Sequence, residues 1–422
     1  MNRMLLFIML SVPLPTMAAE TLVNYPDLPS PAAVEAAIRS SPDVLSAQAG
    51  IKVGEAVRQR LQAGEHEVIM RVMGQRRSIN PSERYREWDI GLERAIRLPG
   101  KAALDGKMGN VEVERSHTLY GDALHETGRV LLKAWFSWNR ERSQSQQWAN
   151  QVELLKKQAG IVAKRVRAGD APRLEIDLAE AAVAQAESTL YQARLREQVA
   201  ANELGQRFPA ISLPASVPAS APVPLQQGLE YWQEEILRHN HELGVARSEA
   251  SLGRLHSERS SADKLPDPTV GLRFGGERDS AEHIVGLHVS FPFPGGARSA
   301  RADEGRAMAE MAAQREAAIL RKVTAESVNS FAAAQAAYGG WQSAQSVAEK
   351  MRGNAELMAR AYSLGEMGLP EVLTARRQAL EANLAAALAR LDAAETRYRL
   401  LLDAHQLWPL DADEEDEGHA HY

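Results

Sequence analysis

The chain has 422 residues, of which 45% are hydrophobic but only 5% aromatic, and its formal net charge is −6. Such a length allows two or three ordinary domains, but the bulky side chains of globular cores are scarce, which indicates long helices packed closely through alanine. Six acidic residues lie between Asp411 and Glu417, so the rest of the chain is nearly neutral and nucleic acid is not an expected partner. The absence of cysteine excludes disulfides, thiolate metal ligands and a lipid-modified cysteine.

Residues 1–19 are typical of a secretory signal. Arg3 precedes an apolar run from Met4 to Val12, which is too short to span a bilayer, and small residues follow at Ala18 and Ala19. We expect cleavage after Ala18 or Ala19; a buried N-terminal helix is the alternative. No later segment reaches 18 apolar residues, so we expect no transmembrane helix, whereas transmembrane strands remain compatible with the sequence.

Residues 20–207 are predicted to form a first unit of helices and one β-hairpin. Within the predicted hairpin, residues 66–98, apolar and polar side chains alternate with a period of two from Trp88 onward. The predicted helices run from Ala32 to Gly64, from Lys101 to Arg167 and from Leu174 to Arg207.

Residues 208–228 are rich in proline and predict a linker. The second unit, residues 229–407, has the same order of elements around a hairpin at residues 268–294. Its helices are predicted from Leu229 to Asp263, from Ala297 to Ser363 and from Glu371 to Leu407, and residues 408–422 form an acidic tail that contains histidines.

The two units are copies of one another. At an offset of 196 residues, AGDAPRLEIDLAEAAVAQAESTLYQARL aligns without a gap with LGEMGLPEVLTARRQALEANLAAALARL, which places Gly169 on Gly365 and Glu175 on Glu371. At ~1.5 Å per residue each long helix spans ~100 Å and each shorter one ~50 Å, so one long helix matches two short ones laid end to end. We therefore expect a rod with strands at one end, helical turns at the other and the linker near its waist.

The strands have the length and alternation of membrane strands, although two surface hairpins on a soluble protein are the alternative. A four-stranded sheet in lipid leaves unpaired backbone groups at its edges, so several chains must close it. Two chains would give eight strands and a filled interior, whereas three would give twelve strands and an open channel. A duct therefore favours a trimer.

With these features, the whole mature chain resembles the TolC family of outer membrane efflux proteins. The resemblance rests on the signal, the tandem order of elements, the hairpin exits Leu98-Pro99-Gly100-Lys101 and Pro294-Gly295-Gly296, and the helical tips. It implies a mainly α fold with a membrane β-barrel: a long α-helical barrel, plus four strands per chain that contribute to a 12-stranded trimeric outer membrane β-barrel. It also implies a homotrimer in the outer membrane of a Gram-negative bacterium, with a periplasmic adaptor and an inner-membrane efflux pump as partners. RLPGK and the histidine-bearing tail resemble the heavy-metal (cobalt-zinc-cadmium) branch.

The resemblance places a gate at the helical turns. It implies acidic pore residues at Glu175 and Glu371, and an inter-helix link through Tyr362. The family's tip arginine falls on Met367 here, and a second acidic pore position falls on Thr374. The resemblance also implies that the adaptor docks at the tips, on Gly169, Asp170, Gly365, Glu366 and Gly368. The alternative is that both glutamates have only a structural role, in which each carboxylate in the first turn of a helix interacts favourably with the helix dipole.

Histidines offer few other sites. His419 and His421, with carboxylates nearby, are candidate metal ligands, and a solvated acidic tail is the alternative. His239 and His241 are two residues apart and point to different sides of a helix, so we expect a core or surface role for them rather than chelation. No nucleophile-base set or HExxH motif is present, so neither an enzyme nor a cofactor is expected.

Two function classes remain: a trimeric efflux duct, and a soluble periplasmic coiled-coil adaptor or structural spacer. The strand faces discriminate between them. Apolar side chains such as Trp88, Phe274, Phe291 and Phe293 favour lipid, whereas a soluble rod would carry polar hairpin faces.

Overall fold

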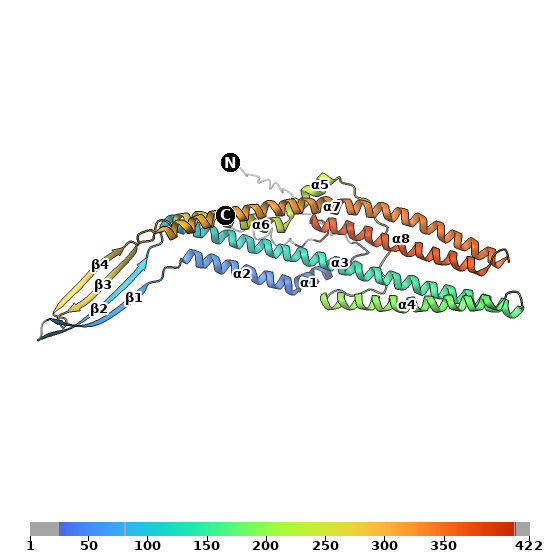
Figure 1. Ribbon diagram of the computed structural model, residues 1–422, viewed down its shortest axis with the longest axis horizontal. Coiled ribbons are helices and arrows are strands. Elements are labelled where there is room, and N and C mark those ends of the chain that lie inside the picture. Colours follow the sequence, from blue (N-terminus) through green and yellow to red (C-terminus); the bar gives the residue numbers. More distant parts are fainter. Residues whose placement is uncertain (1–24, 80–81, 409, 411–422) are drawn as a thin grey trace, which may run out of the picture.

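The computed structural model describes residues 25–79, 82–408 and 410. The chain forms a long rod with a β-sheet at one end and two helical turns at the other (Figure 1). The two halves contain the same elements in the same order. The first half consists of α1 (Pro31–Arg39), α2 (Pro42–Ala63), β1 (Ile69–Ile79), β2 (Glu83–Ala95), α3 (Pro99–Ala168) and α4 (Arg173–Arg207). The second consists of α5 (Leu229–His239), α6 (His241–Ala262), β3 (Thr269–Glu277), β4 (Glu282–Ser290), α7 (Gly296–Ser363) and α8 (Leu369–Asp403).

The first helix of each half is broken, where the sequence predicted one continuous helix. In the first half the break falls before Pro42, which lacks a backbone N–H and therefore suits the first turn of a new helix. In the second half Asn240 separates α5 from α6, and its Oδ1 accepts a hydrogen bond from Leu243 N over 2.8 Å. Asparagine is among the best N-cap residues, so the new helix begins there.

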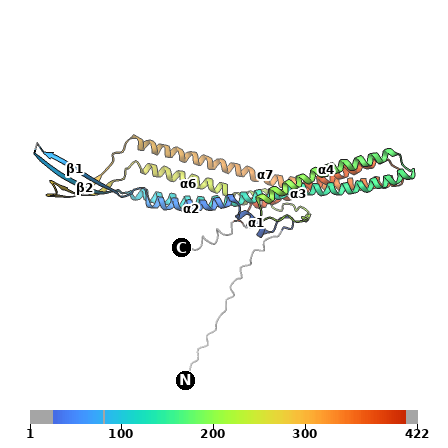
Figure 2. The same ribbon diagram turned by 90° about the horizontal axis from the view of Figure 1, so that it is seen from below.

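Each long helix is flanked by two shorter ones. Helix α3 packs against α2 on the half nearer the sheet and against α4 on the half nearer the turns, and α7 packs against α6 and α8 in the same way (Figures 1 and 2). The lengths predicted this arrangement, because α3 has 70 residues and α4 has 35. None of the helices in the described part of the chain is both long and apolar enough to cross a membrane.

Glycines set the close approach of the helix pairs at equivalent places in both halves. A Cβ added at Gly109 in α3 would lie 3.0 Å from the Cα of Arg58 in α2. A Cβ added at Gly305 in α7 would lie 3.3 Å from the Cα of Ser257 in α6. Because ordinary contacts are longer, a side chain at either position would push the helices apart. The repeat is thus preserved in the packing as well as in the sequence.

The large side chains gather at the middle of the rod. There Trp135, Phe136 and Trp138 of α3 are almost fully buried against Leu400 and Leu402 of α8, together with residues from α1, α4, α5 and α7. Towards the turns, most buried positions hold alanine, valine or leucine. Several of the few aromatic residues therefore build one central core, and the arms extend from it as closely packed helices.

Residues 208–228 connect α4 to α5 without helix or strand, and they cross this central core. Phe208 and Ile211 are buried in it. Arg142 of α3 donates hydrogen bonds to the carbonyl oxygens of Pro214, over 3.1 Å, and of Ala215. These contacts tie the connection to α3.

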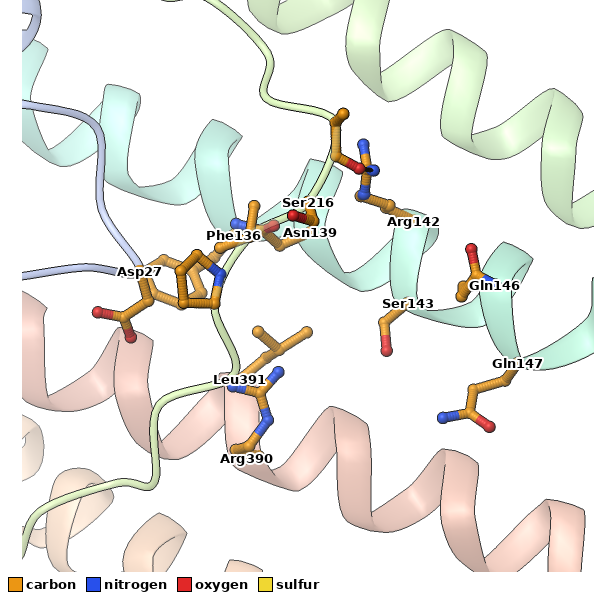
Figure 3. Close-up of a pocket in the computed structure, with 13 residues that line it drawn as sticks. Asp27, Phe136, Asn139, Arg142, Ser143, Gln146, Gln147, Ser216, Arg390 and Leu391 are labelled. Carbon is orange, nitrogen blue, oxygen red and sulfur yellow. Dashed lines mark hydrogen bonds between the residues drawn. The ribbon is translucent and has the colours of Figure 1, made fainter. Parts of the chain in front are cut away.

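A cleft of about 310 Å³ remains beneath this connection (Figure 3). Side chains of α3, from Phe136 to Gln147, line one wall, and Arg390 and Leu391 of α8 line the other. Burial lowers the pKa of Arg390, whose Nη1 donates to Ser220 O over 3.3 Å. The cleft is a gap where the connection crosses two helices, and two of its polar side chains, Arg142 and Arg390, bind carbonyl oxygens of the connection.

The four strands form one antiparallel sheet in the order β1-β2-β3-β4. Strands β2 and β3 come from different halves of the chain and pair over eight positions, with Leu92 opposite Leu272. This pairing joins the two hairpins into one surface. Among the described residues of a single chain, no further strand pairs with the outer edges of β1 and β4.

Candidate functional site

One face of the sheet is apolar across all four strands. Cross-strand rows place Leu92 beside Leu272 and Leu272 beside Leu287, and a second row joins Phe274 to Val285. These side chains are open to the surroundings: Val285 is 75% exposed and Leu287 is 69% exposed. The same face carries Met70, Val72, Ile90, Val270 and Val289. An exposed apolar face that continues across four strands is typical of contact with lipid or with another protein surface.

The opposite face is polar and laced with charge pairs. Arg71 of β1 donates to Glu93 of β2 over 2.7 Å, and His288 of β4 lies 3.3 Å from the same carboxylate. Arg273 of β3 pairs with Asp89 of β2. The sheet is therefore amphipathic, with the alternation that the sequence predicted from Trp88 onward.

A buried ion-pair network fixes the sheet to the helices. The side chain of Lys101, at the start of α3, is only 2% exposed, and its Nζ lies 3.1 Å from Asp263 and 2.9 Å from Asp267. Asp267 also lies 3.0 Å from His66 and accepts a hydrogen bond from Leu98 N over 3.2 Å. The RLPGK segment of one half is thus clamped onto the helix-to-strand connection of the other.

Electrostatics support this clamp. Burial opposes the charged form of Asp263, but hydrogen bonds from Arg259 and Lys101 outweigh it and lower the pKa of the carboxyl group. The pKa of Asp267 is lowered in the same way, because hydrogen bonds from His66 and Lys101 outweigh its burial. Both carboxylates therefore stay charged at neutral pH.

The two helical turns at the far end have one geometry. At Gly169 (φ 80°) the N–H of Asp170 donates to Arg165 O over 2.9 Å, and at Gly365 (φ 79°) the N–H of Glu366 donates to Ala361 O over 3.0 Å. This is the Schellman ending, in which a left-handed glycine closes the helix and reverses the chain. Both tips are therefore backbone-determined turns that expose Asp170 and Glu366.

Tyr362 connects the two helical hairpins near these tips. Its hydroxyl, on α7, donates to Glu175 Oε2, on α4, over 2.7 Å. The guanidinium of Arg165, on α3, lies 4.6 Å from the centre of the tyrosine ring. Tyr362 is 3% exposed, and burial together with the bond to Glu175 raises its pKa.

The structure separates the two glutamates that the sequence treats as equivalent. Glu175 is held by Tyr362, whereas Glu371 is exposed in the first turn of α8, close to the backbone of Gly368. Met367, where the resemblance places an arginine, packs against the apolar cluster of the tip, and Thr374 is exposed.

Arg165 is the residue that sequence reasoning missed. A basic residue in the last turn of a helix predicts only a favourable interaction with the helix dipole. Its cation-π contact with Tyr362 brings together residues of different halves, which no local pattern encodes. The other sequence candidates at the ends, the signal at residues 1–19 and the metal ligands His419 and His421, lie outside the described residues.

Solved outer membrane channels have the same architecture. The CmeC outer membrane channel of Campylobacter jejuni matches with a TM-score of 0.73 at 13% identity, over 92% of this chain and 89% of that one. The outer membrane protein VceC of Vibrio cholerae matches with a TM-score of 0.72 at 16% identity, over 90% of this chain and 99% of that one. The open-state MtrE outer membrane channel of Neisseria gonorrhoeae matches with a TM-score of 0.72 at 15% identity, over 89% of each chain. No protein-family model and no curated protein matches the sequence.

The chain therefore has the fold of outer membrane channels. The fold that the resemblance to the TolC family predicted, with long paired helices, a tandem repeat and four strands per chain, is confirmed. CmeC and MtrE, which share this fold, are outer membrane channels.

Proposed function

We propose that this protein is the outer membrane exit duct of a tripartite efflux system. In this proposal, substrate enters at the helical tips from a periplasmic adaptor and an inner-membrane pump, and leaves through the barrel to the exterior. The observation that carries the proposal is the amphipathic sheet with two free edges at one end of a helical rod. Lipid accommodates the apolar face, but the unpaired backbone groups at the two edges cannot be left in lipid, so association with other chains must pair them.

Three copies satisfy the geometry of a duct. Joining β1 of one chain to β4 of the next repeats the antiparallel pairing already present within each chain. A ring of three chains has twelve strands, which leaves an open lumen, whereas a ring of two would be filled by its own side chains. The charged face with Arg71, Asp89 and Glu93 would then line the lumen, and the apolar face would contact lipid.

The helical tips supply the gate in this proposal. Three copies of the exposed Glu371 around one axis would repel each other and attract cations, which forms a polar constriction. The link from Tyr362 to Glu175, backed by Arg165, would hold the hairpins in the closed arrangement. The exposed residues of the two turns, Gly169, Asp170, Gly365, Glu366 and Gly368, are the proposed docking points for the adaptor.

The alternative is a soluble periplasmic spacer or adaptor, and the apolar sheet face disfavours it. A heavy-metal cargo is a narrower proposal, and it rests on the RLPGK segment and the histidine-bearing tail alone. Resistance assays would test the proposed metal cargo. Deletion of the gene should sensitise cells to Co²⁺, Zn²⁺ or Cd²⁺, and unchanged resistance would rule out a heavy-metal cargo.

Ion conduction in planar bilayers tests the duct itself. The detergent-purified protein should give discrete conductance steps that increase when the tip is opened by the Tyr362→Phe substitution. If neither the protein nor this variant conducts, the duct assignment fails.

A further inference from the structure

Three histidines from distant parts of the chain meet at the middle of the rod. His125 lies in α3, His241 is the first residue of α6, and His405 follows the end of α8. One ring nitrogen from each can be chosen so that all three lie within 4.8 Å of one another. The rings of His125 and His405 are 3.8 Å apart, and the His241 ring is 4.9 Å from the first and 5.2 Å from the second.

His405 has a left-handed backbone conformation, which is unusual for a residue other than glycine. Its φ is 57°, and it closes α8 by a Schellman ending: His405 N donates to Leu402 O over 3.0 Å, and Gln406 N donates to Leu401 O over 2.8 Å. Glycine is the usual residue at this position, as at both tips, because other residues pay roughly 1 kcal/mol or more for the left-handed conformation. Here an imidazole occupies the glycine position, and it points at two other imidazoles.

The His241 ring fits into the cluster because residue 121 of α3 is a glycine without a side chain. A Cβ added at Gly121, in the turn of α3 before His125, would lie 2.5 Å from Cε1 and 2.7 Å from Nδ1 of His241. Such distances do not occur between real atoms, so the ring occupies its position only because residue 121 is glycine. His125 is 3% exposed, whereas His241 and His405 are partly exposed, so the cluster lies between the buried interior and the surface of the rod.

We propose that His125, His241 and His405 form a binding site for a divalent transition-metal cation, with Zn²⁺ as the best-fitting ion. Imidazole nitrogens suit Zn²⁺, and three of them leave one position of a tetrahedral site for water. Metal-nitrogen bonds of about 2.0–2.1 Å place donor atoms about 3.3 Å apart, so donor atoms that now lie within 4.8 Å of one another need to approach by up to about 1.5 Å. Asp122 lies one turn before His125 on α3, which adds an acidic residue to the surroundings of the cluster.

The bound ion would join three elements that the chain connects only through long segments. It would tie the middle of α3 to the start of α6 and the end of α8, beside the break at Asn240. This site is distinct from His419 and His421. It also stands independently of the proposed duct, because it concerns the chain alone.

The decisive variant is His405→Gly. It removes one ligand and at the same time installs the residue that the left-handed turn prefers, so the variant should fold at least as well as the parent. Gly121→Ala is a second variant, since the added methyl group would displace the His241 ring. His256→Gln is the matched control, because His256 is an exposed histidine on the same helix α6, about 22 Å further along.

All proteins would carry the full chain with His419→Ala and His421→Ala, which removes binding by the tail. After treatment with a chelator in detergent, each would be titrated with Zn²⁺ by calorimetry, and with Co²⁺ by visible absorption. We expect one Zn²⁺ per chain in the parent and in His256→Gln, together with a raised melting temperature. Binding should weaken by more than about 100-fold in His405→Gly and clearly in Gly121→Ala.

Two outcomes would overturn the proposal. In one, the tail-substituted parent binds no Zn²⁺, and the three rings are then a stacked packing cluster. In the other, His405→Gly binds Zn²⁺ with the affinity of the parent, and the ion then lies elsewhere.

Discussion

The hydroxyl of Tyr362 lies 2.7 Å from Glu175 Oε2, and this hydrogen bond joins the α7–α8 hairpin to the α3–α4 hairpin just behind the two tips. Around it the apolar cluster of Val162, Leu369 and Val372 closes the same contact. The bond is sheltered, because Tyr362 is 3% exposed. A buried hydrogen bond between the two hairpins is the kind of contact that a gate must break before its helices swing outward.

Tyr362→Phe should therefore favour the open tip. The substitution removes only the donor, and a hydrogen bond to a charged group contributes roughly 1.5–3 kcal/mol, which corresponds to a shift of about tenfold or more towards opening. Single-channel recordings in planar bilayers should show a higher mean conductance. Tyr191→Phe is the control, since Tyr191 of α4 is 72% exposed. Equal conductance in the variant and the parent would show that Tyr362 does not hold the tip closed.

Glu371→Gln should change the ion selectivity of the duct. The substitution removes three like charges from one ring while it preserves the shape of the side chain. Reversal potentials in a KCl gradient should shift towards lower cation preference, and conductance should rise as repulsion within the ring disappears. Glu381→Gln, on the same helix and about 15 Å further from the tip, should leave the selectivity unchanged. A selectivity identical to that of the parent would show that Glu371 does not line the constriction.

Leu287→Arg should prevent assembly in the membrane. Leu287 lies at the middle of β4 on the apolar face, opposite Leu272, and an arginine facing the bilayer midplane costs about 2–4 kcal/mol. The neighbouring His288→Arg places the same charge on the opposite face, beside Glu93, and should be tolerated. The yield of trimer in outer membrane extracts measures both. Equal yields would contradict a lipid-facing role for the apolar face.

Lys101→Met should weaken the ion-pair clamp of Lys101, Asp263 and Asp267, which fixes the sheet to the helices. It removes the most buried partner of Asp263 and Asp267, while Asp263 keeps Arg259 and Asp267 keeps His66 and Leu98 N. The expected loss is therefore smaller than the roughly 3 kcal/mol that an unpaired buried charge costs. Lys264→Met is the control, because Lys264 is an exposed neighbour. Melting temperatures in detergent, followed by circular dichroism, should fall for the first variant only.

The same ion-pair clamp makes the melting temperature depend on pH in the acidic range. The pKa values of Asp263 and Asp267 are lowered in the folded chain, so their contribution is complete above the ordinary carboxyl pKa of about 3.9 and is lost as the pH falls further. The melting temperature of the parent should therefore fall as the pH drops below about 4. In Lys101→Met the drop should be shallower, and an equally steep drop would assign the acid sensitivity to other groups.

Local patterns in the sequence predicted much of the architecture. The repeat at an offset of 196 residues, the glycines at 169 and 365 and the alternation around Trp88 are all short-range signals, and helices, turns and sheet follow them. The breaks at Pro42 and Asn240 were also encoded locally, by a proline and a capping residue. The prediction overlooked them because the hydrophobic pattern continues across both.

Contacts between distant segments could not be predicted in this way. His239 and His241 taken as a pair make a poor chelate, and only the fold brings His241 to His125 and His405. Nothing in the sequence around His405 announces a left-handed residue, because the glycine that normally marks one is absent. Arg165 and Tyr362 likewise meet only because the two copies pack side by side.

The central claim, a trimeric duct in the outer membrane, is tested most directly by the mass of the particle that the native protein forms. Cell membranes would be separated by density, the protein would be extracted with detergent, and light scattering with correction for bound detergent would give the protein mass. We predict that the protein fractionates with the outer membrane and that each particle contains three chains. A monomer recovered in buffer without detergent would contradict the duct and support the soluble spacer.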